Sequence, residues 1–489
     1  MKIKLVLITD THIADTAIDD DRRCDLAENF LTRAIYRLNR WIKPDAVLFL
    51  GDLVEDDGQE SLPARLERVA GLLSNIECPY LVIPGNHDVP AERFYRIFPQ
   101  PGDYLDVKGV RLASFVDPEA ADYNARRREG DLDRMLALRQ GHQGPIIACQ
   151  HVALFPPGSV DSPFNLVNAD DVIAVMRQVG ISLSVGGHYH DGFGLIKDGG
   201  ISFLGVPGLM KAPFQFVELD IDGDSIDVTR HCLRLPENRL LVDGHIHTPL
   251  ACCNQNMDPG AVLQLAQALQ MGGVAFAEHA DHICLPDGLS EEDADLPANR
   301  TVPPSSARAE EYFAMLDQAG VSADSVGFEV EISGAGRLLI RPEERSRAAF
   351  IIGSVHAVPE RKQSRPDYEL FCQQFMAASQ QLLGSGVRVL AHPWRVFRRS
   401  HLPVPEHLFA PMVAMLKEAG VGAEVNFHTN EPPAAFFKLC LEAGVKIAFG
   451  SDAHNMREPA ELWPHVQLIR QIGFDGDLGD ILLDPRFGA

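Results

Sequence analysis

Short apolar runs alternate with amphipathic stretches along most of the chain, and this alternation restricts the fold more than any other sequence feature. Four to seven mostly aliphatic residues in a row are typical of strands buried on both faces. Apolar residues spaced three and four apart are typical of helices that pack on a sheet. Repeated strand–helix units predict an α/β fold with largely parallel strands. Polar residues, histidine above all, come directly after many of the apolar runs.

The first half of the chain contains six such strands, two helices and a hairpin. The predicted strands are Lys2–Ile8, Ala46–Leu50, Tyr80–Ile83, Ile146–Cys149, Ile181–Val185 and Ile201–Leu204, and the predicted helices are Asp25–Trp41 and Leu62–Leu73. Two further segments, Phe214–Asp220 and Ser225–His231, flank the turn at 221–224 and predict a β-hairpin.

The pattern restarts after a linker at 235–238. The predicted strands are Leu240–His245, Gly273–Ala277, Ser325–Val330, Phe350–Gly353, Val387–Ala391, Gly422–Asn426 and Lys446–Gly450, and the predicted helices are Ala261–Gln270, Arg308–Gly320, Tyr368–Leu383, Pro411–Ala419 and Phe436–Ala443. We therefore predict two domains, residues 1–236 and 240–489, of which the second is a βα barrel. The acidic stretch 290–300 is expected to be an exposed loop.

Net charge and cysteine content limit which molecules the protein can bind and where in the cell it can lie. The chain has 44 Lys and Arg residues against 68 Asp and Glu residues, a net charge of −24 over 489 residues. So acidic a protein is a poor ligand for nucleic acid or an anionic membrane, but it can hold a small phosphorylated substrate in a local cationic site. The 9 cysteines include no CxxC pair, and no apolar run reaches the length of a membrane span. We expect a cytoplasmic protein and leave its oligomeric state open.

In the first half, a set of polar residues follows the predicted strands. Its members are Asp10, His12, Asp52, Asn86, His87, His151, His188 and His190. Strand ends at one edge of a sheet can converge on one crevice, and carboxylates, an amide oxygen and imidazoles together suit Mn, Fe or Zn. A carboxylate can bridge two ions, and two ions a few Å apart can clamp both oxygens of a phosphoryl displacement.

This set resembles the calcineurin-like metallophosphoesterases over about residues 1–235. The segment 51–56 lacks the Arg of the protein Ser/Thr phosphatases and is more similar to the branch with bacterial cyclic-nucleotide phosphodiesterases and glycerophosphodiesterases. The resemblance implies an α/β/β/α sandwich with two metal ions. One ion would bind Asp10, His12, Asp52 and His190, and the other Asp52, Asn86, His151 and His188. His87 would be the proton donor or transition-state stabiliser, so His87 and Asp52 are the predicted catalytic residues.

The second half repeats this logic with other spacings. The residues at its predicted strand ends are His245, His247, Glu278, His279, Glu329, His356, His392, Asp452 and His454. In a βα barrel, the carboxyl ends of the strands face one mouth. Six imidazoles there would repel one another if protonated, and metal ions would explain their convergence.

These residues resemble the polymerase-and-histidinol-phosphatase (PHP) family over about 241–489, and its histidinol-phosphate phosphatase branch most. The resemblance implies a distorted (β/α)7 barrel with two or three ions (Zn, Mn or Fe) held by the nine residues above, with Glu278 the least certain of them. Cys253 stands where many members have another His. Either its thiolate favours zinc, or the site holds fewer ions.

Five basic residues follow the barrel histidines: Arg361, Lys362, Arg395, Arg398 and Arg399. They are candidates for phosphate binding, with ordinary solvated charges as the alternative. Asp281, His282 and His231 have no comparable setting, and we expect them in loops or on the surface. Glu424 matches a strand-end motif of the PHP family but receives no role.

The sequence thus predicts a metal-dependent phosphoesterase with two sites. The first half would hydrolyse a small phosphodiester and the second a phosphomonoester, in sequence, by attack of metal-bound hydroxide. In one alternative only one domain is catalytic and the other is an accessory, or a metal-stabilised interaction module. A nuclease is a further alternative, which the negative charge disfavours. Substrate and metal identity stay open.

Overall fold

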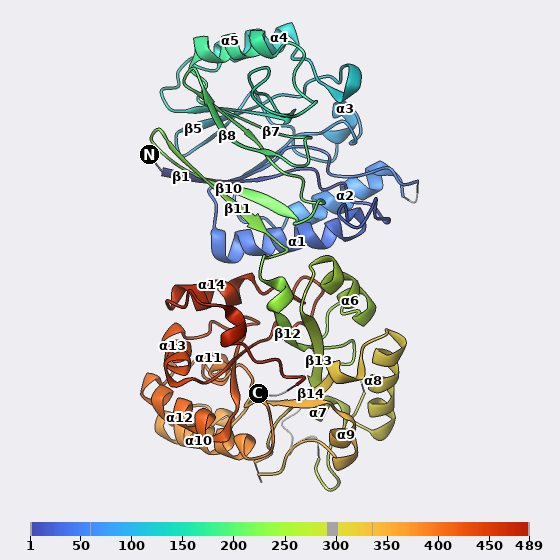
Figure 1. Ribbon diagram of the computed structural model, residues 1–489, viewed down its shortest axis with the longest axis vertical. Coiled ribbons are helices and arrows are strands. Elements are labelled where there is room, and N and C mark those ends of the chain that lie inside the picture. Colours follow the sequence, from blue (N-terminus) through green and yellow to red (C-terminus); the bar gives the residue numbers. More distant parts are fainter. Residues whose placement is uncertain (1, 59, 291–301, 335, 488–489) are drawn as a thin grey trace. The chain divides into compact units, whose positions relative to one another are not determined.

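The computed structural model describes residues 2–58, 60–290, 302–334 and 336–487 (Figure 1). The chain divides into two compact units, Met1–Arg234 and Leu235–Ala489. The expected loop at 290–300 lies outside the described residues except for Ser290. Within the described part of the chain, no helix has both the length and the apolar character needed to span a membrane.

Two sheets form the first unit. The five-stranded sheet has the order β11 (Ser225–Cys232), β10 (Gln215–Asp222), β1 (Lys2–Ile8), β2 (Ala46–Phe49) and β3 (Tyr80–Val82). The six-stranded sheet has the order β4 (Leu105–Val107), β5 (Val110–Ser114), β6 (Ile146–Val152), β7 (Leu183–Gly187), β9 (Ile201–Gly205) and β8 (Phe193–Asp198). The central strands β1–β2–β3 and β5–β6–β7–β9 run parallel.

The sheets pack face to face, because alternate residues of both meet in one apolar core that includes Leu5, Leu48, Ile147 and Val185. Helices α4 (Glu129–Ala137) and α5 (Ala169–Val179) cover the outer face of the six-stranded sheet, while α1 (Ala27–Arg37) and α2 (Leu62–Leu73) lie beyond the other sheet (Figure 1). A four-residue helix, α3 (Ala91–Phe94), follows β3. Because β1, β2 and β3 are parallel neighbours, their carboxyl ends lie together at one edge of the five-stranded sheet.

Seven parallel strands form a nearly closed, barrel-like sheet in the second unit. They are β12 (Val242–Ile246), β13 (Gly273–His279), β14 (Val326–Val330), β15 (Phe350–Gly353), β16 (Val389–Leu390), β17 (Gly422–Val425) and β18 (Ile447–Phe449). A parallel bridge between Ile246, the last residue of β12, and Ala453, which follows β18, connects the first strand to the chain that leaves the last. The helices are α6 (Pro259–Ala268), α7 (Ala280–Ile283), α8 (Ser306–Gln318), α9 (Pro342–Arg347), α10 (Tyr368–Leu383), α11 (Arg395–Arg399), α12 (Phe409–Ala419), α13 (Ala434–Ala443) and α14 (Trp463–Gln471).

Strand alternation decides what faces the barrel interior. Val274 and Phe276 of β13 belong to the core shared with the helices, whereas Ala275 and Ala277 belong to a smaller core inside the sheet. Side chains alternate along a strand, so His279 at the end of β13 continues the interior face. The small interior residues give way to polar ones where the strands end, and this places the predicted ligands at one mouth.

The predicted mixed α/β fold is confirmed, and the barrel-like sheet agrees with the predicted barrel. Helices Leu62–Leu73 and Tyr368–Leu383 have the predicted bounds. The sequence pattern missed β4, β5 and β8, the last of which is an edge strand with five of its six residues partly or fully exposed.

Candidate functional site

Strained backbone at strand ends positions the polar residues of the first unit. Asp10 and His12 follow β1 with φ of 51° and 42°, and Asp52 follows β2 with φ of 52°. Left-handed backbone is uncommon for residues other than glycine and clusters at functional sites. The Asp10 amide donates to Gly51 O over 3.0 Å, and the His12 amide donates to Asp52 O over 3.0 Å. The two strand ends are therefore fixed to each other.

Two groups of potential ligand atoms share one carboxylate oxygen. In the first group, His12 Nε2 lies 3.5 Å from Asp52 Oδ2 and 3.7 Å from Asp10 Oδ1, and His190 Nε2 lies 3.4 Å from Asp10 Oδ1. In the second group, His151 Nε2 lies 3.2 Å from Asp52 Oδ2, 3.1 Å from Asn86 Oδ1 and 3.2 Å from His188 Nδ1. The structure thus brings all seven predicted ligands together, with Asp52 between the two groups.

The donor atoms of this centre fit metal ions. Two ligands at about 2.0–2.2 Å from one ion lie about 3–3.6 Å apart, close to the separations found here. Asp10 Oδ1, His12 Nε2 and Asp52 Oδ2 are buried and have no hydrogen-bond partner among the described residues. Buried polar atoms are nearly always paired, so unpaired atoms at ligand spacing indicate a cation site.

Glu55 is a residue of this centre that the sequence gave no role. Its carboxylate lies 2.9 Å from His12 Nδ1 and 3.1 Å from His87 Nδ1. Carboxylates behind metal-ligating histidines fix the ring orientation. The hydrogen bond to Glu55 raises the pKa of His87, whose side chain is 38% exposed, while the His87 amide donates to Asp52 Oδ1 over 2.8 Å. His87 is therefore held beside the cluster without being enclosed by it.

The electrostatics of the cluster favour ionised carboxylates. Burial raises the pKa of Asp52, but the charge and hydrogen bond of His151 and the charge of His12 outweigh burial and lower the pKa to about 2. Burial, together with the charge of His151, lowers the pKa of His188 to about 4. At neutral pH the centre therefore presents charged carboxylates and a neutral His188, which suit metal binding. The neighbouring carboxylates outweigh burial and raise the pKa of His12 to about 10 and of His151 to about 9, so these two histidines would release protons when an ion binds.

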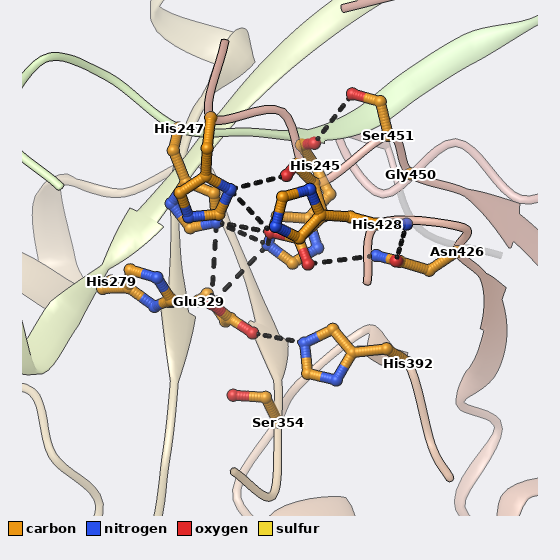
Figure 2. A network of polar contacts seen from close by, with 12 residues as sticks. His245, His247, His279, Glu329, Ser354, His392, Asn426, His428, Gly450 and Ser451 are labelled. Atoms are coloured by element: carbon orange, nitrogen blue, oxygen red, sulfur yellow. Dashed lines mark hydrogen bonds and ion pairs between the residues drawn. The ribbon is translucent and has the colours of Figure 1, made fainter. Parts of the chain in front are cut away.

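The barrel holds a second set of converging atoms (Figure 2). His247 Nε2 lies 2.9 Å from Asp452 Oδ1, 3.1 Å from His245 Nε2 and 3.8 Å from Glu329 Oε2. His245 Nε2 lies 3.6 Å from Glu329 Oε2 and 3.7 Å from Asp452 Oδ1. Such spacing matches four ligands around one ion. Glu329 Oε2 is buried and makes no hydrogen bond of good geometry among the described atoms, while His279 Nδ1 lies 2.7 Å away, so this group also fits a cation.

Carboxylates behind these histidines fix their orientation. Glu424, which received no role from the sequence, lies 2.8 Å from His245 Nδ1 and also accepts from the His392 amide. Glu278 was predicted as a ligand, but its Oε1 lies 3.0 Å from His247 Nδ1 and its Oε2 accepts from Thr248. Both oxygens of Glu278 are engaged, so the structure places it behind His247 as an orienting partner.

Arg395 lies among the predicted ligands of the barrel. His392 Nε2 and His356 Nε2 lie 2.8 and 3.4 Å from Glu329 Oε1. The Arg395 guanidinium lies 2.7 Å from both nitrogens and donates to Asp452 Oδ2. Only 3% of Arg395 is exposed. Here it neutralises Asp452 and contacts two predicted histidine ligands, and it also lines the cavity described next, so its predicted contact with phosphate stays a prediction.

A cavity of about 740 Å³ opens beside this centre. Arg361, Lys362, Arg395 and Arg399 line it together with His279, His356 and His454. Burial and the charges of Arg395 and Arg361 lower the pKa of Arg399, so the positive charges converge. Arg398, the fifth predicted phosphate-binding residue, is exposed and does not line the cavity.

The prediction that Asp281, His282 and His231 lie in loops or on the surface is wrong. All three are buried. His231 lies on β11, where its Nε2 is 2.8 Å from Glu218 Oε2, and the other two lie on the short helix α7 and line the cavity. A helix of four residues shows no readable periodicity in the sequence, which is why their burial was missed.

Comparison with known proteins identifies the class of the first unit. Residues 3–192 match the calcineurin-like phosphoesterase family. The N-terminal part of the chain is therefore a calcineurin-like metallophosphoesterase domain, of a family that depends on two metal ions and acts on phosphoesters.

Three known proteins are each similar to about half of this chain. The chain is 28% identical over 247 residues to a Synechococcus sp. protein named as a probable cyclic nucleotide phosphodiesterase, an alignment covering 46% of this chain and 90% of that protein. Among solved structures, a dimetal phosphatase from Danio rerio has 16% identity and a TM-score of 0.41, covering 47% of this chain and 96% of that chain. A purple acid phosphatase from yellow lupin (Lupinus luteus) has 14% identity and a TM-score of 0.33, covering 47% and 52%.

Proposed function

We propose that the protein is a metal-dependent phosphoesterase with two active sites. The first unit hydrolyses a small phosphodiester, and the second, a PHP-type barrel, hydrolyses a phosphomonoester. The observation that carries the proposal is Asp52 Oδ2, a buried oxygen without a hydrogen-bond partner among the described residues, 3.5 Å from His12 Nε2 and 3.2 Å from His151 Nε2. A carboxylate oxygen between two imidazole groups is the arrangement expected of a bridging ligand in a two-metal site.

Each residue of the first site has a distinct part in diester cleavage. Asp10, His12, Asp52 and His190 would hold one ion, and Asp52, Asn86, His151 and His188 the other. Two bound ions supply Lewis acidity toward the phosphoryl oxygens. Glu55 holds Nδ1 of His87, which leaves Nε2 as the atom that can donate a proton to the departing oxygen.

The substrate class follows from the named relative and from charge. The Synechococcus protein carries the name of a cyclic nucleotide phosphodiesterase, and a cyclic nucleotide is a small diester that a protein of net charge −24 can accept at a local site. Hydrolysis of a cyclic nucleotide yields a phosphomonoester. The barrel cavity, lined by Arg361, Lys362 and Arg399, offers the cations that a phosphomonoester dianion requires. We therefore propose that the two reactions follow one another.

A second candidate function has its own supporting observation. Because Arg395 contacts His356, His392 and Asp452, the barrel can neutralise part of its own ligand set. In this alternative only the first unit is catalytic, and the barrel is a metal-stabilised accessory or interaction module.

The test is turnover of bis-p-nitrophenyl phosphate by the full-length protein loaded with Mn²⁺, Fe²⁺ or Zn²⁺. Nitrophenol is followed by absorbance and inorganic phosphate by phosphorus NMR. The proposal expects both nitrophenols to leave and free phosphate to appear. Asp52→Asn should abolish the first step, and Asp452→Asn should abolish the second and cause p-nitrophenyl phosphate to accumulate.

The matched controls are exposed aspartates in the same units. Asp56→Asn and Asp475→Asn should leave both steps unchanged, since both side chains are exposed. Unchanged diester cleavage by Asp52→Asn would refute the first half of the proposal. Accumulation of the monoester by the wild-type protein on this substrate and on a nucleoside monophosphate would favour the accessory role of the barrel.

A further inference from the structure

Two adjacent thiols and two buried imidazoles meet on the wall of the barrel cavity. Cys252 and Cys253 lie in the turn between β12 and α6, His279 ends β13, and His282 lies on α7. All four side chains line the cavity. Cys252 and His282 belong to neither ligand group predicted from the sequence, and hydrolysis gives them no part.

The sulfur and nitrogen atoms have the spacing of metal ligands. Cys252 Sγ lies 3.7 Å from His282 Nε2, and Cys253 Sγ lies 3.9 Å from His279 Nε2. The centroids of the His279 and His282 rings are 4.4 Å apart. A zinc ion about 2.3 Å from sulfur and about 2.0–2.1 Å from nitrogen, in tetrahedral geometry, separates these atoms by about 3.6 Å. Small side-chain adjustments would therefore bring the four atoms to one ion.

A neighbouring carboxylate prepares His279 for this role. His279 Nδ1 lies 2.7 Å from Glu329 Oε2, so the carboxylate favours the tautomer that carries the ring proton on Nδ1. Nε2 then keeps its lone pair and directs it toward Cys253. A metal-ligating histidine characteristically donates its other ring N–H to a carboxylate, which fixes the tautomer.

The chemistry of this cluster differs from that of the neighbouring centre. The group of His245, His247, Glu329 and Asp452 combines imidazoles with carboxylates, whereas the wall cluster combines imidazoles with thiols. Thiolates select zinc and other thiophilic ions over manganese and magnesium. We propose that Cys252, Cys253, His279 and His282 form a separate binding site for a thiophilic divalent cation, with zinc as its natural occupant.

Cobalt spectroscopy tests the site without relying on enzymatic activity. Metal-stripped, reduced full-length protein is titrated with Co²⁺, and the sulfur-to-cobalt charge-transfer band in the near ultraviolet is recorded. The first unit contributes no cysteine to its candidate centre, so the band reports thiolate ligation alone. The wild-type protein should show a band that corresponds to one Co²⁺ ion per chain at this site. Added Zn²⁺ should displace that Co²⁺ and abolish the band.

The deciding variants are Cys252→Ser and His282→Gln, because neither residue belongs to the ligand sets predicted from the sequence. Each should lose at least half of the band, and each should weaken zinc binding by more than the ~10- to 100-fold that loss of an outer-shell partner costs. Cys78→Ser replaces a partly exposed thiol of the first unit and should change nothing. Cys252 is exposed, so its replacement leaves the packing intact even if His282→Gln destabilises α7.

Three results would overturn the proposal: no charge-transfer band in the wild-type protein, a band unaffected by Cys252→Ser, or a band that only Cys253→Ser removes. The last result would show that Cys253 ligates with other partners. Zinc content by elemental analysis should fall by one equivalent in Cys252→Ser relative to the Cys78→Ser control, and equal zinc content would count against the site.

Discussion

The two candidate centres use the same residue types but balance their charges differently. In the first unit, Asp52 Oδ2 lies between two imidazole groups and has no hydrogen-bond partner among the described residues. In the barrel, Glu329 occupies the equivalent place between histidines, but Arg395 reaches in and contacts Asp452, His356 and His392. The centre of the first unit therefore leaves its bridging carboxylate to bound metal ions, whereas the barrel supplies the guanidinium of Arg395 as a cation from its own chain.

The comparison shows that a ligand set read from strand ends does not by itself fix how many ions it holds. A guanidinium is permanently charged and presents several donors, so it can satisfy atoms that would otherwise bind an ion. Imidazoles can instead release their protons when an ion arrives. The first centre is therefore expected to respond more strongly to metals than the barrel.

The largest expected difference between the centres concerns His87, which Glu55 holds beside the first cluster. His87→Gln should lower kcat for diester hydrolysis by about 10²- to 10⁴-fold, the range of a lost general acid, and leave monoester hydrolysis unchanged. His407→Gln, at an exposed histidine of the second unit, is the control and should affect neither rate. Equal losses on both substrates would show that one site performs both reactions.

The second expected difference is in stability. In metal-free protein, Asp452→Asn should lower the free energy of unfolding of the barrel by about 3–5 kcal/mol, because it leaves the buried Arg395 charge without its carboxylate. Asp52→Asn should cost the first unit only about 1–3 kcal/mol, since His12 and His151 can release protons once Asp52 is neutral. Hydrogen exchange in β1–β3 and in β12–β18 measures the two units separately. If Asp52→Asn lowered the free energy of unfolding of the first unit by more than Asp452→Asn lowers that of the barrel, the expected order of the two effects would be wrong.

Much of this arrangement could be predicted from the sequence, because strands buried on both faces leave continuous apolar runs and the ligands follow them. All seven barrel strands were predicted, and even β16, with two residues, lay within the predicted 387–391. The positive φ of Asp10 and Asp52 is a consequence of the close approach of two strand ends, which no local pattern reveals. Edge strand β8 was missed because its alternation is weak.

The outer-shell residues were harder to predict, for a physical reason. Glu55 and Glu424 act on histidines distant in sequence, and a carboxylate in a loop or at a strand end has no signature that distinguishes it from a solvated one. Arg395 was correctly associated with the barrel mouth, but its direction depends on the fold of α11. Sequence spacing identifies which polar residues converge, and the three-dimensional packing decides which of them face one another.

A third prediction concerns metal content. Arg395→Gln should allow the barrel to bind one more divalent ion per chain, because it frees His356, His392 and Asp452 from the guanidinium. Elemental analysis after dialysis against Mn²⁺ measures the change. Arg398→Gln, at an exposed position of the same helix, should leave the metal content unchanged. Identical metal content in the two variants would mean that Arg395 does not compete with an ion.

The smallest expected effect separates the cations of the barrel cavity from its surface charges. Arg399 lines the cavity and Arg398, next to it on α11, does not. Arg399→Ala should raise KM for a phosphomonoester by about tenfold, about 1.4 kcal/mol, because a charge-assisted contact to phosphate is lost. Diester hydrolysis should not change, since that reaction is assigned to the first unit. Arg398→Ala should leave both KM values within error, and equal effects of the two variants would mean that only general electrostatic attraction draws phosphate to the barrel.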